Sequence, residues 1–215
     1  MAHRGQELPA TLVDVVARRV RDDILSGELQ PGAKIVEEQV CAELGISRAP
    51  LREALRLLSE QGLVEHLPRR GSRVVEWSPS DVLQLFALRE VLERHAVESA
   101  LPLADPEEAL AEVRGALATM RSARGELDRD DAHRAFHASV VSLARNKQLD
   151  IALAPILLKL QLPMAKNLRE ERKHSRSEGI ARHEELLAAL ETNDPEVVVK
   201  AMHEHGHLTY LHLEQ

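Results

Sequence analysis

Two short helical patterns joined by Gly45-Ile46-Ser47 constrain the fold of the N-terminal third of this chain more than any other feature. Apolar spacing predicts a helix over 36–44, and the glycine directly after it readily takes the left-handed conformation that ends a helix. Ser47 is a favoured N-cap, so we expect the next helix to run from there to Gln61. A turn this short brings the two helices together as a helix-turn-helix.

The segment that follows predicts a small hairpin. β-prone residues at 64–67 and 73–75 flank the sequence Pro-Arg-Arg-Gly-Ser at 68–72, which combines turn-forming residues with positive charge. We expect these residues to form a wing with an exposed basic tip beside the helix-turn-helix.

Positive charge is concentrated in these elements, although the chain as a whole has a net charge of −7. Arg48, Arg52 and Arg56 are spaced by four and share one face of the expected helix, next to an apolar face that can pack inward. Residues 48–73 hold six arginines and three glutamates. A helix fits the major groove, where guanidinium groups can bind guanine bidentately. The combination indicates DNA binding; a solvated amphipathic helix with ordinary ion pairs is the alternative.

A change of pattern at residues 76–79 divides the chain. Beyond it the apolar spacing is helical throughout, and aromatic residues make up only 2% of the sequence, which leaves the core to aliphatic side chains. We expect a mainly α-helical protein, with a winged helix-turn-helix at 1–77 and an all-helical domain at 78–215. Pro155 and Pro163 predict a kink or a split in the fourth helix of the second domain. The six helices expected there span residues 80–101, 106–121, 128–145, 148–173, 177–191 and 195–213.

Composition favours a cytoplasmic protein. A single cysteine, Cys41, permits no internal disulfide, which fits a reducing compartment. The most apolar run, at 151–158, contains a proline and is far shorter than the roughly 20 residues that a membrane-spanning helix needs. Residues 1–10 lack the apolar core of a signal peptide. We therefore expect no association with a membrane.

Histidines are the second concentration of chemically versatile side chains, with eleven in the chain. His133 and His137 lie four residues apart on one expected helix, so their imidazoles project from the same face and can bind one metal ion. Asp130 precedes them on that face and can act as a further ligand or orient an imidazole. A pair of hydrogen-bonded or solvent-exposed histidines is the alternative.

The basic helix and hairpin resemble the winged helix-turn-helix of GntR-family transcription regulators. The resemblance is carried by the run at 46–55, by Leu58, by Gly-Leu-Val at 62–64 and by Arg-Arg-Gly at 69–71. Glu38 stands where some members carry a basic contact residue, which leaves the operator sequence open. The DNA contacts that the resemblance implies are Arg48 and Arg52 to bases or phosphates, and Arg69, Arg70 and Gly71 in the wing.

The helical part is similar to the all-helical effector domain called FCD. The matching residues are His133-Arg134-Ala135-Phe136-His137, Asn146, His183, Asp194-Pro195 and His205. Six helices rather than seven suggest the FadR subfamily and its shorter, VanR-like branch.

A metal site follows from this resemblance. The family usually begins its first motif with aspartate, where this chain has His133, and Asp130 can join the site or take the place of that histidine. Imidazole ligands favour a divalent transition metal such as zinc or nickel over harder ions. The implied ligands are His133, His137, His183 and His205.

The resemblance also implies an effector. In that fold an anionic small molecule completes the metal coordination, and Arg89 and Arg134 are placed to clamp its carboxylate, with surface ion pairs as the alternative for both. The chain is therefore expected to be a repressor of transcription that binds double-stranded DNA as a homodimer and responds to a small organic acid. A helical metallohydrolase using a histidine-bound metal is one alternative, and it lacks a recognisable motif. A DNA-binding scaffold without an effector is another.

Overall fold

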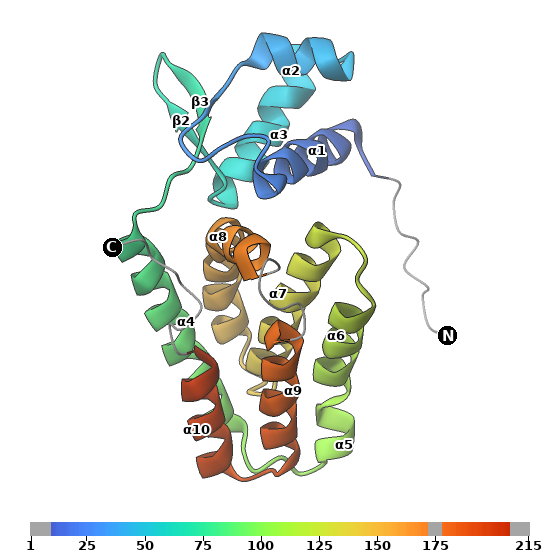
Figure 1. The fold of residues 1–215 in the computed structure, drawn as a ribbon, viewed down its shortest axis with the longest axis vertical. Helices are drawn as coiled ribbons and strands as arrows, with labels where there is room; N and C mark the ends of the chain where they lie inside the picture. Colours follow the sequence, from blue (N-terminus) through green and yellow to red (C-terminus); the bar gives the residue numbers. More distant parts are fainter. Residues whose placement is uncertain (1–9, 172–177, 207–215) are drawn as a thin grey trace. The chain divides into compact units, whose positions relative to one another are not determined.

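The computed structural model describes residues 10–171 and 178–206, and it divides into two compact units after Glu76 (Figure 1). The N-terminal unit combines three helices with a small sheet, and the C-terminal unit is helical throughout the part that is described. The elements of the first unit are α1 (Leu12–Ser26), β1 (Lys34–Ile35), α2 (Glu37–Leu44), α3 (Arg48–Glu60), β2 (Val64–Leu67) and β3 (Gly71–Val74).

Local signals account for where these helices begin and end. A capping box starts α1, in which Thr11 Oγ1 accepts from the Asp14 amide over 3.2 Å and the Asp14 carboxylate accepts from the Thr11 amide over 2.9 Å. Gly45 ends α2 in the left-handed conformation, with φ 64°. Ser47 occupies the expected N-cap of α3, but its side chain makes no capping hydrogen bond.

The winged helix-turn-helix is confirmed, with one strand that the sequence did not reveal. α1 packs against α3, and α3 also contacts α2 and β2. The hairpin of β2 and β3 is antiparallel, with Leu67 opposite Gly71 at its tip. β1 pairs with the other edge of β3, so the sheet order is β1-β3-β2. The buried side chains of this unit include Val16, Val20, Ile24, Ile35, Leu51, Leu55, Leu58, Leu63 and Val74.

The second unit confirms the expected all-helical domain. Its second helical stretch is interrupted at Leu110, and its fourth runs unbroken through Pro155 and Pro163, so the split expected there does not occur. The helices are α4 (Pro79–Ala100), α5 (Pro106–Ala109), α6 (Ala111–Ser122), α7 (Glu126–Ser142), α8 (Lys147–Glu171), α9 (Glu178–Glu191) and α10 (Pro195–Gly206).

Helix α7 lies at the centre of this unit, packed against α4, α6 and α8. Helices α9 and α10 pack on each other, and they close the bundle against α6 and α4 respectively. The core is mostly aliphatic, as the low aromatic content predicts, and Phe136 is its largest fully buried side chain. The main cluster also contains Val113, Leu117, Val140, Leu186, Leu190, Val198 and Met202.

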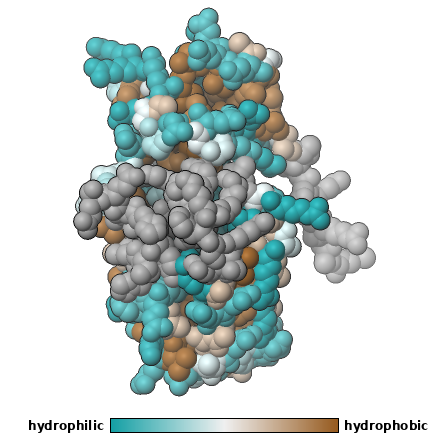
Figure 2. All heavy atoms as spheres, viewed as in Figure 1, coloured by the Kyte–Doolittle hydropathy of each residue, from teal (hydrophilic) through white to brown (hydrophobic). Residues whose placement is uncertain are grey.

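Hydrophilic and apolar residues are interspersed on the face shown in Figure 2. Within the described residues, no helix is both long and apolar enough to span a bilayer.

Candidate metal centre and nucleic-acid interface

The two faces of α3 have opposite characters. Leu51, Ala54, Leu55 and Leu58 are buried and hold the helix on α1 and the sheet. Arg48, Arg52 and Arg56 are exposed on the other side, as their spacing predicts. The helix therefore presents a cationic surface that its own packing fixes in place.

Carboxylates pair with half of the six arginines at 48–73. Arg52 Nε donates to Glu37 Oε2 over 2.9 Å, and Arg73 Nε donates to Glu65 Oε1 over 2.6 Å. Arg56 contacts both Glu53 and Glu60.

The other three arginines are Arg48, Arg69 and Arg70, which are exposed and have no ion-pair partner among the described residues. These three guanidinium groups are open to an external anion, so the chemistry at this surface suits a phosphate backbone.

Backbone geometry shapes the wing tip. The Arg70 amide donates to the Leu67 carbonyl over 2.9 Å, which closes the turn between β2 and β3. Arg69 and Gly71 both have positive φ, 63° and 87°. Glycine tolerates that conformation readily, whereas a β-carbon at position 71 would be strained. The tight turn exposes two adjacent arginines at the tip.

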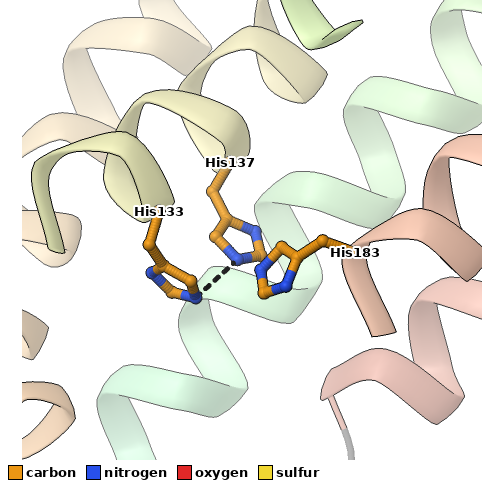
Figure 3. Close-up of side chains that lie close together, drawn as sticks. All are labelled: His133, His137 and His183. Atoms are coloured by element: carbon orange, nitrogen blue, oxygen red, sulfur yellow. Dashed lines mark hydrogen bonds between the residues drawn. The ribbon is translucent and has the colours of Figure 1, made fainter. Parts of the chain in front are cut away.

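Three histidines converge in the core of the helical unit (Figure 3). His133 and His137 come from α7 and His183 from α9, and the nearest ring nitrogens of all three lie within 4.8 Å of one another. His133 Nε2 and His137 Nε2 are 3.3 Å apart. All three side chains are buried. Nitrogen atoms at this separation can share one metal ion.

His205 on α10 lies beside this group. Its ring centroid is 4.5 Å from that of His183 and 5.2 Å from that of His137. Its Nδ1 is buried and has no hydrogen-bond partner. The structure thus brings three of the four expected ligands into one tight cluster and places the fourth next to two of them.

Hydrogen bonding selects one nitrogen of His183. Its Nδ1 lies 2.7 Å from the Gly179 carbonyl oxygen, which can only accept, so Nδ1 carries the proton and Nε2 carries the lone pair. That Nε2 is buried without a hydrogen-bond partner. An unsatisfied buried acceptor is costly, so this atom marks a place where a ligand fits.

Burial lowers the pKa of all four histidines. Desolvation is the largest cause for each, and nearby cationic groups, Arg89 among them, add to it. The pKa of His183 falls to about 4. Neutral imidazoles at pH 7 are the form that binds a metal, and they are borderline ligands that suit zinc or nickel. The residues present therefore fit a divalent transition metal.

Sequence reasoning missed Glu93, which adjoins this cluster. Its Oε1 lies 2.9 Å from His137 Nδ1 and 3.2 Å from Arg89 Nε, and both charged side chains are about 95% buried. Burial raises the pKa of Glu93, and the guanidinium of Arg89 opposes that rise. Only the i,i+4 spacing from Arg89 hinted at the pair, and the fold supplies the contact with His137. Asp130 is also buried.

The two arginines expected to hold an effector lie in different surroundings. Arg89 is buried beside Glu93, and its Cζ is 5.2 Å from the centroid of the Phe86 ring. Arg134 is partly exposed, pairs with Asp131 over 3.1 Å and lines a hollow between α6 and α7. Arg89 therefore adjoins the histidines, whereas Arg134 faces the surface.

Two family models match the chain. The model described as bacterial regulatory proteins, gntR family, matches residues 12–74, and the FCD domain model matches residues 84–208. An HTH-type transcriptional regulator in an unstable DNA locus of Streptomyces ambofaciens is 31% identical over 190 residues, which are 87% of this chain and 78% of the relative.

A second relative and a solved structure agree with these matches. The probable D-xylose utilization operon transcriptional repressor of Paenarthrobacter nicotinovorans is 30% identical over 197 residues, covering 88% of this chain and 85% of that protein. The crystal structure of a GntR transcriptional regulator from Rhodococcus sp. RHA1 has a TM-score of 0.72 and 26% identity, and the match covers 90% of this chain and 93% of that one.

These relatives are transcriptional regulators and not enzymes, so the metallohydrolase alternative is not supported. The two family matches lie on the two structural units, the first on the winged helix-turn-helix and the second on the helical bundle that holds the histidines. The chain belongs to the GntR family of bacterial transcription regulators and carries an FCD domain.

Proposed function

We propose that this regulator is a repressor that binds a near-palindromic operator as a homodimer, in the cytoplasm. The observation that carries the DNA-binding part is that Arg48, Arg69 and Arg70 are exposed on one winged helix-turn-helix and have no ion-pair partner in the described part of the chain. Arg48 and Arg52 read bases in the major groove, and Arg69, Arg70 and Gly71 bind the adjacent backbone or minor groove. A relative named as a probable transcriptional repressor supports the direction of control.

Dimerisation follows from the size of the DNA-binding unit. One winged helix-turn-helix contacts few base pairs, and two half-sites read together supply the selectivity that a genome requires. Sedimentation equilibrium of the full chain at micromolar concentration is expected to give about 48 kDa, twice the 24.0 kDa of one chain. A monomer that binds its selected duplex with one chain per site would contradict this.

Selection from a randomised duplex pool tests the recognition helix. The wild type enriches a preferred duplex, and footprinting on it is repeated with Arg48→Ala, Arg52→Ala and the double variant. Each single change is expected to weaken binding of that duplex by about 1–3 kcal/mol, the value of one bidentate base contact. Protection at wild-type affinity by the double variant would show that α3 is not the reading element.

For the helical unit, we propose that His133, His137, His183 and His205 hold zinc or nickel, with Asp130 joining the site or taking the place of His133. When bound, the ion supplies a Lewis-acidic position for a carboxylate of a small organic acid, and the guanidinium of Arg89 provides the second anchor. Arg134 is a second candidate anchor, although it faces the surface. A ligand that prefers one conformation of the regulator shifts its population and thereby its affinity for the operator.

Elemental analysis of protein purified without an affinity tag or chelator tests the metal. The wild type is expected to carry about one transition-metal ion per chain, and His183→Ala is expected to lose it. His133→Asp restores the ligand usual in the family and is expected to keep a site that favours harder ions. The metal proposal would be wrong if the wild type carried no metal and showed no thermal shift with zinc or nickel. The chain would then be better described as a DNA-binding scaffold without an effector metal.

A further inference from the structure

Glu37, the first residue of α2, contacts the recognition helix α3. Arg52 Nε donates to Glu37 Oε2 over 2.9 Å, across the turn of the helix-turn-helix. We infer that Glu37 is a positioning residue that fixes the Arg52 guanidinium for reading a base pair in the major groove. The inference rests on the base contact proposed for Arg52.

The geometry of the contact leaves the reading edge of the arginine free. The bond uses Nε, and no other acceptor binds Arg52 among the described residues. Nη1 and Nη2 therefore remain as a fork that matches O6 and N7 of guanine. The Arg52 side chain is 65% exposed and that of Glu37 only 20%, so the carboxylate is the less exposed partner and the arginine projects outward from it.

Arg56, one turn further along α3, provides the contrast. Its Nε and Nη2 both donate to Glu53, and its Nη1 donates to Glu60. Both edges of that guanidinium are occupied, so Arg56 has no free fork. An exposed ion pair contributes little to stability, so a purely structural reason for pairing Glu37 with Arg52 is weak.

A carboxylate on a DNA-binding face also has a cost, because it repels phosphates. Removal of Glu37 is therefore expected to change two quantities with opposite signs. Binding to duplexes of random sequence rises, since a negative charge is gone, while binding to the preferred duplex loses the restraint on Arg52. A residue that only supported the fold would weaken both, and one that only repelled DNA would strengthen both.

Glu38 offers a matched control. It lies in the same first turn of α2, so its removal changes the charge and the helix-dipole interaction equally. It is exposed and has no ion-pair partner among the described residues. The experiment compares Glu37→Ala, Glu37→Gln, Glu38→Ala and Arg52→Ala, using the full chain and two duplexes: the one that wild type enriches and one of scrambled sequence.

The ratio of the two affinities is the readout. Glu37→Ala is expected to lower it about tenfold, within the range of one bidentate contact, whereas Glu38→Ala removes an equal charge without freeing Arg52 and is expected to lower it much less. Glu37→Gln keeps an acceptor for Nε and is expected to retain most of the ratio. Affinities for duplexes with one base pair changed locate the effect. Glu37→Ala and Arg52→Ala should both lose discrimination at the same base pair.

A double-mutant cycle completes the test, because a positioning residue acts only through its partner. Adding Glu37→Ala to Arg52→Ala should not lower the ratio further. An unchanged ratio in Glu37→Ala, or additive losses in the double variant, would overturn the role of Glu37. Undiminished selectivity in Arg52→Ala would instead overturn the base contact itself, and thermal melting of each variant excludes loss of fold as the cause.

Discussion

Burial decides what each ionisable side chain can do in this regulator. Arg48 is exposed and can meet a phosphate or a base with its charge intact. His137 is fully buried, so its charged form is disfavoured and its neutral form is available to a metal. The sequence alone left ordinary ion pairs and isolated histidines open as alternatives. The exposure of Arg48 supports the proposed DNA contact, and the burial of His137 beside His133 and His183 supports the proposed metal site.

The wing offers a direct test of phosphate contact. Arg70→Ala is expected to weaken binding to all duplexes by a similar factor and to lower the slope of log affinity against log salt by about 1. Arg56→Ala is the matched control, because Glu53 and Glu60 already neutralise that guanidinium. Titrations at several salt concentrations measure the slope, and equal slopes for wild type and Arg70→Ala would remove Arg70 from the contact set.

The buried histidines predict how the stability of metal-free protein depends on pH. Their pKa values are ordinary when unfolded, near 6.5, and lower when folded, about 4 for His183. Between those values the unfolded state binds more protons, so stability falls as pH falls below about 6.5, by up to about 1.4 kcal/mol per pH unit for each histidine. Glu93 opposes this, because burial raises its pKa and its uptake of a proton favours the folded state at low pH.

Urea unfolding of chelator-treated protein from pH 7 to pH 4.5 measures that slope. His183→Gln removes one of the responsible groups and is expected to flatten the slope. A flat profile in the wild type would mean that the histidines are hydrated when the metal is absent.

At the scale of elements, helix caps are testable in isolation. The side chain of Ser78 accepts from the Asp81 amide over 3.2 Å, and the Asp81 carboxylate accepts from the Ser78 amide over 3.0 Å. Ser78→Ala breaks this capping box at the start of α4 and is expected to cost about 1 kcal/mol of unfolding free energy. Ser80→Ala, inside the same first turn, is the control and should change it by less than about 0.5 kcal/mol.

Elements specified by local signals could be predicted from the sequence, and those specified by distant partners could not. Gly45 ends α2 and Asp105-Pro106 starts α5 as expected, because caps act within a few residues. β1 has only two residues, too few for a periodic pattern, and it exists because β3 offers an edge about 40 residues later. The spacing of His133 and His137 indicated the histidine pair, and the resemblance to a family added His183 and His205. The contact of Glu93 with His137 required the packing of α4 on α7.

At the scale of the whole molecule, a single tryptophan allows the two units to be followed separately. Trp77 belongs to the C-terminal unit, where it packs against Val82, Phe86, Ile156 and Leu160 between α4 and α8. Its fluorescence therefore reports the helical unit, while far-ultraviolet circular dichroism reports helices in both. Because each unit has its own core, we expect two melting transitions, of which only one coincides with the change in fluorescence.

Zinc should raise the melting temperature of the helical unit only, which is the transition that Trp77 fluorescence reports. The proposed ligands lie on α7, α9 and α10 and come together only when the helical unit is folded. Zinc at about 100 times its dissociation constant should therefore stabilise this unit by about 2.7 kcal/mol, a shift of several degrees. The melting temperature of the DNA-binding unit should not change with zinc. His183→Ala should abolish the zinc-induced shift of the helical unit and leave the melting temperature of the DNA-binding unit unchanged. An equal rise in both melting temperatures would contradict this and would mean that zinc binding couples the two units. The metal would then affect DNA binding through that coupling, and not through the stability of the helical unit alone.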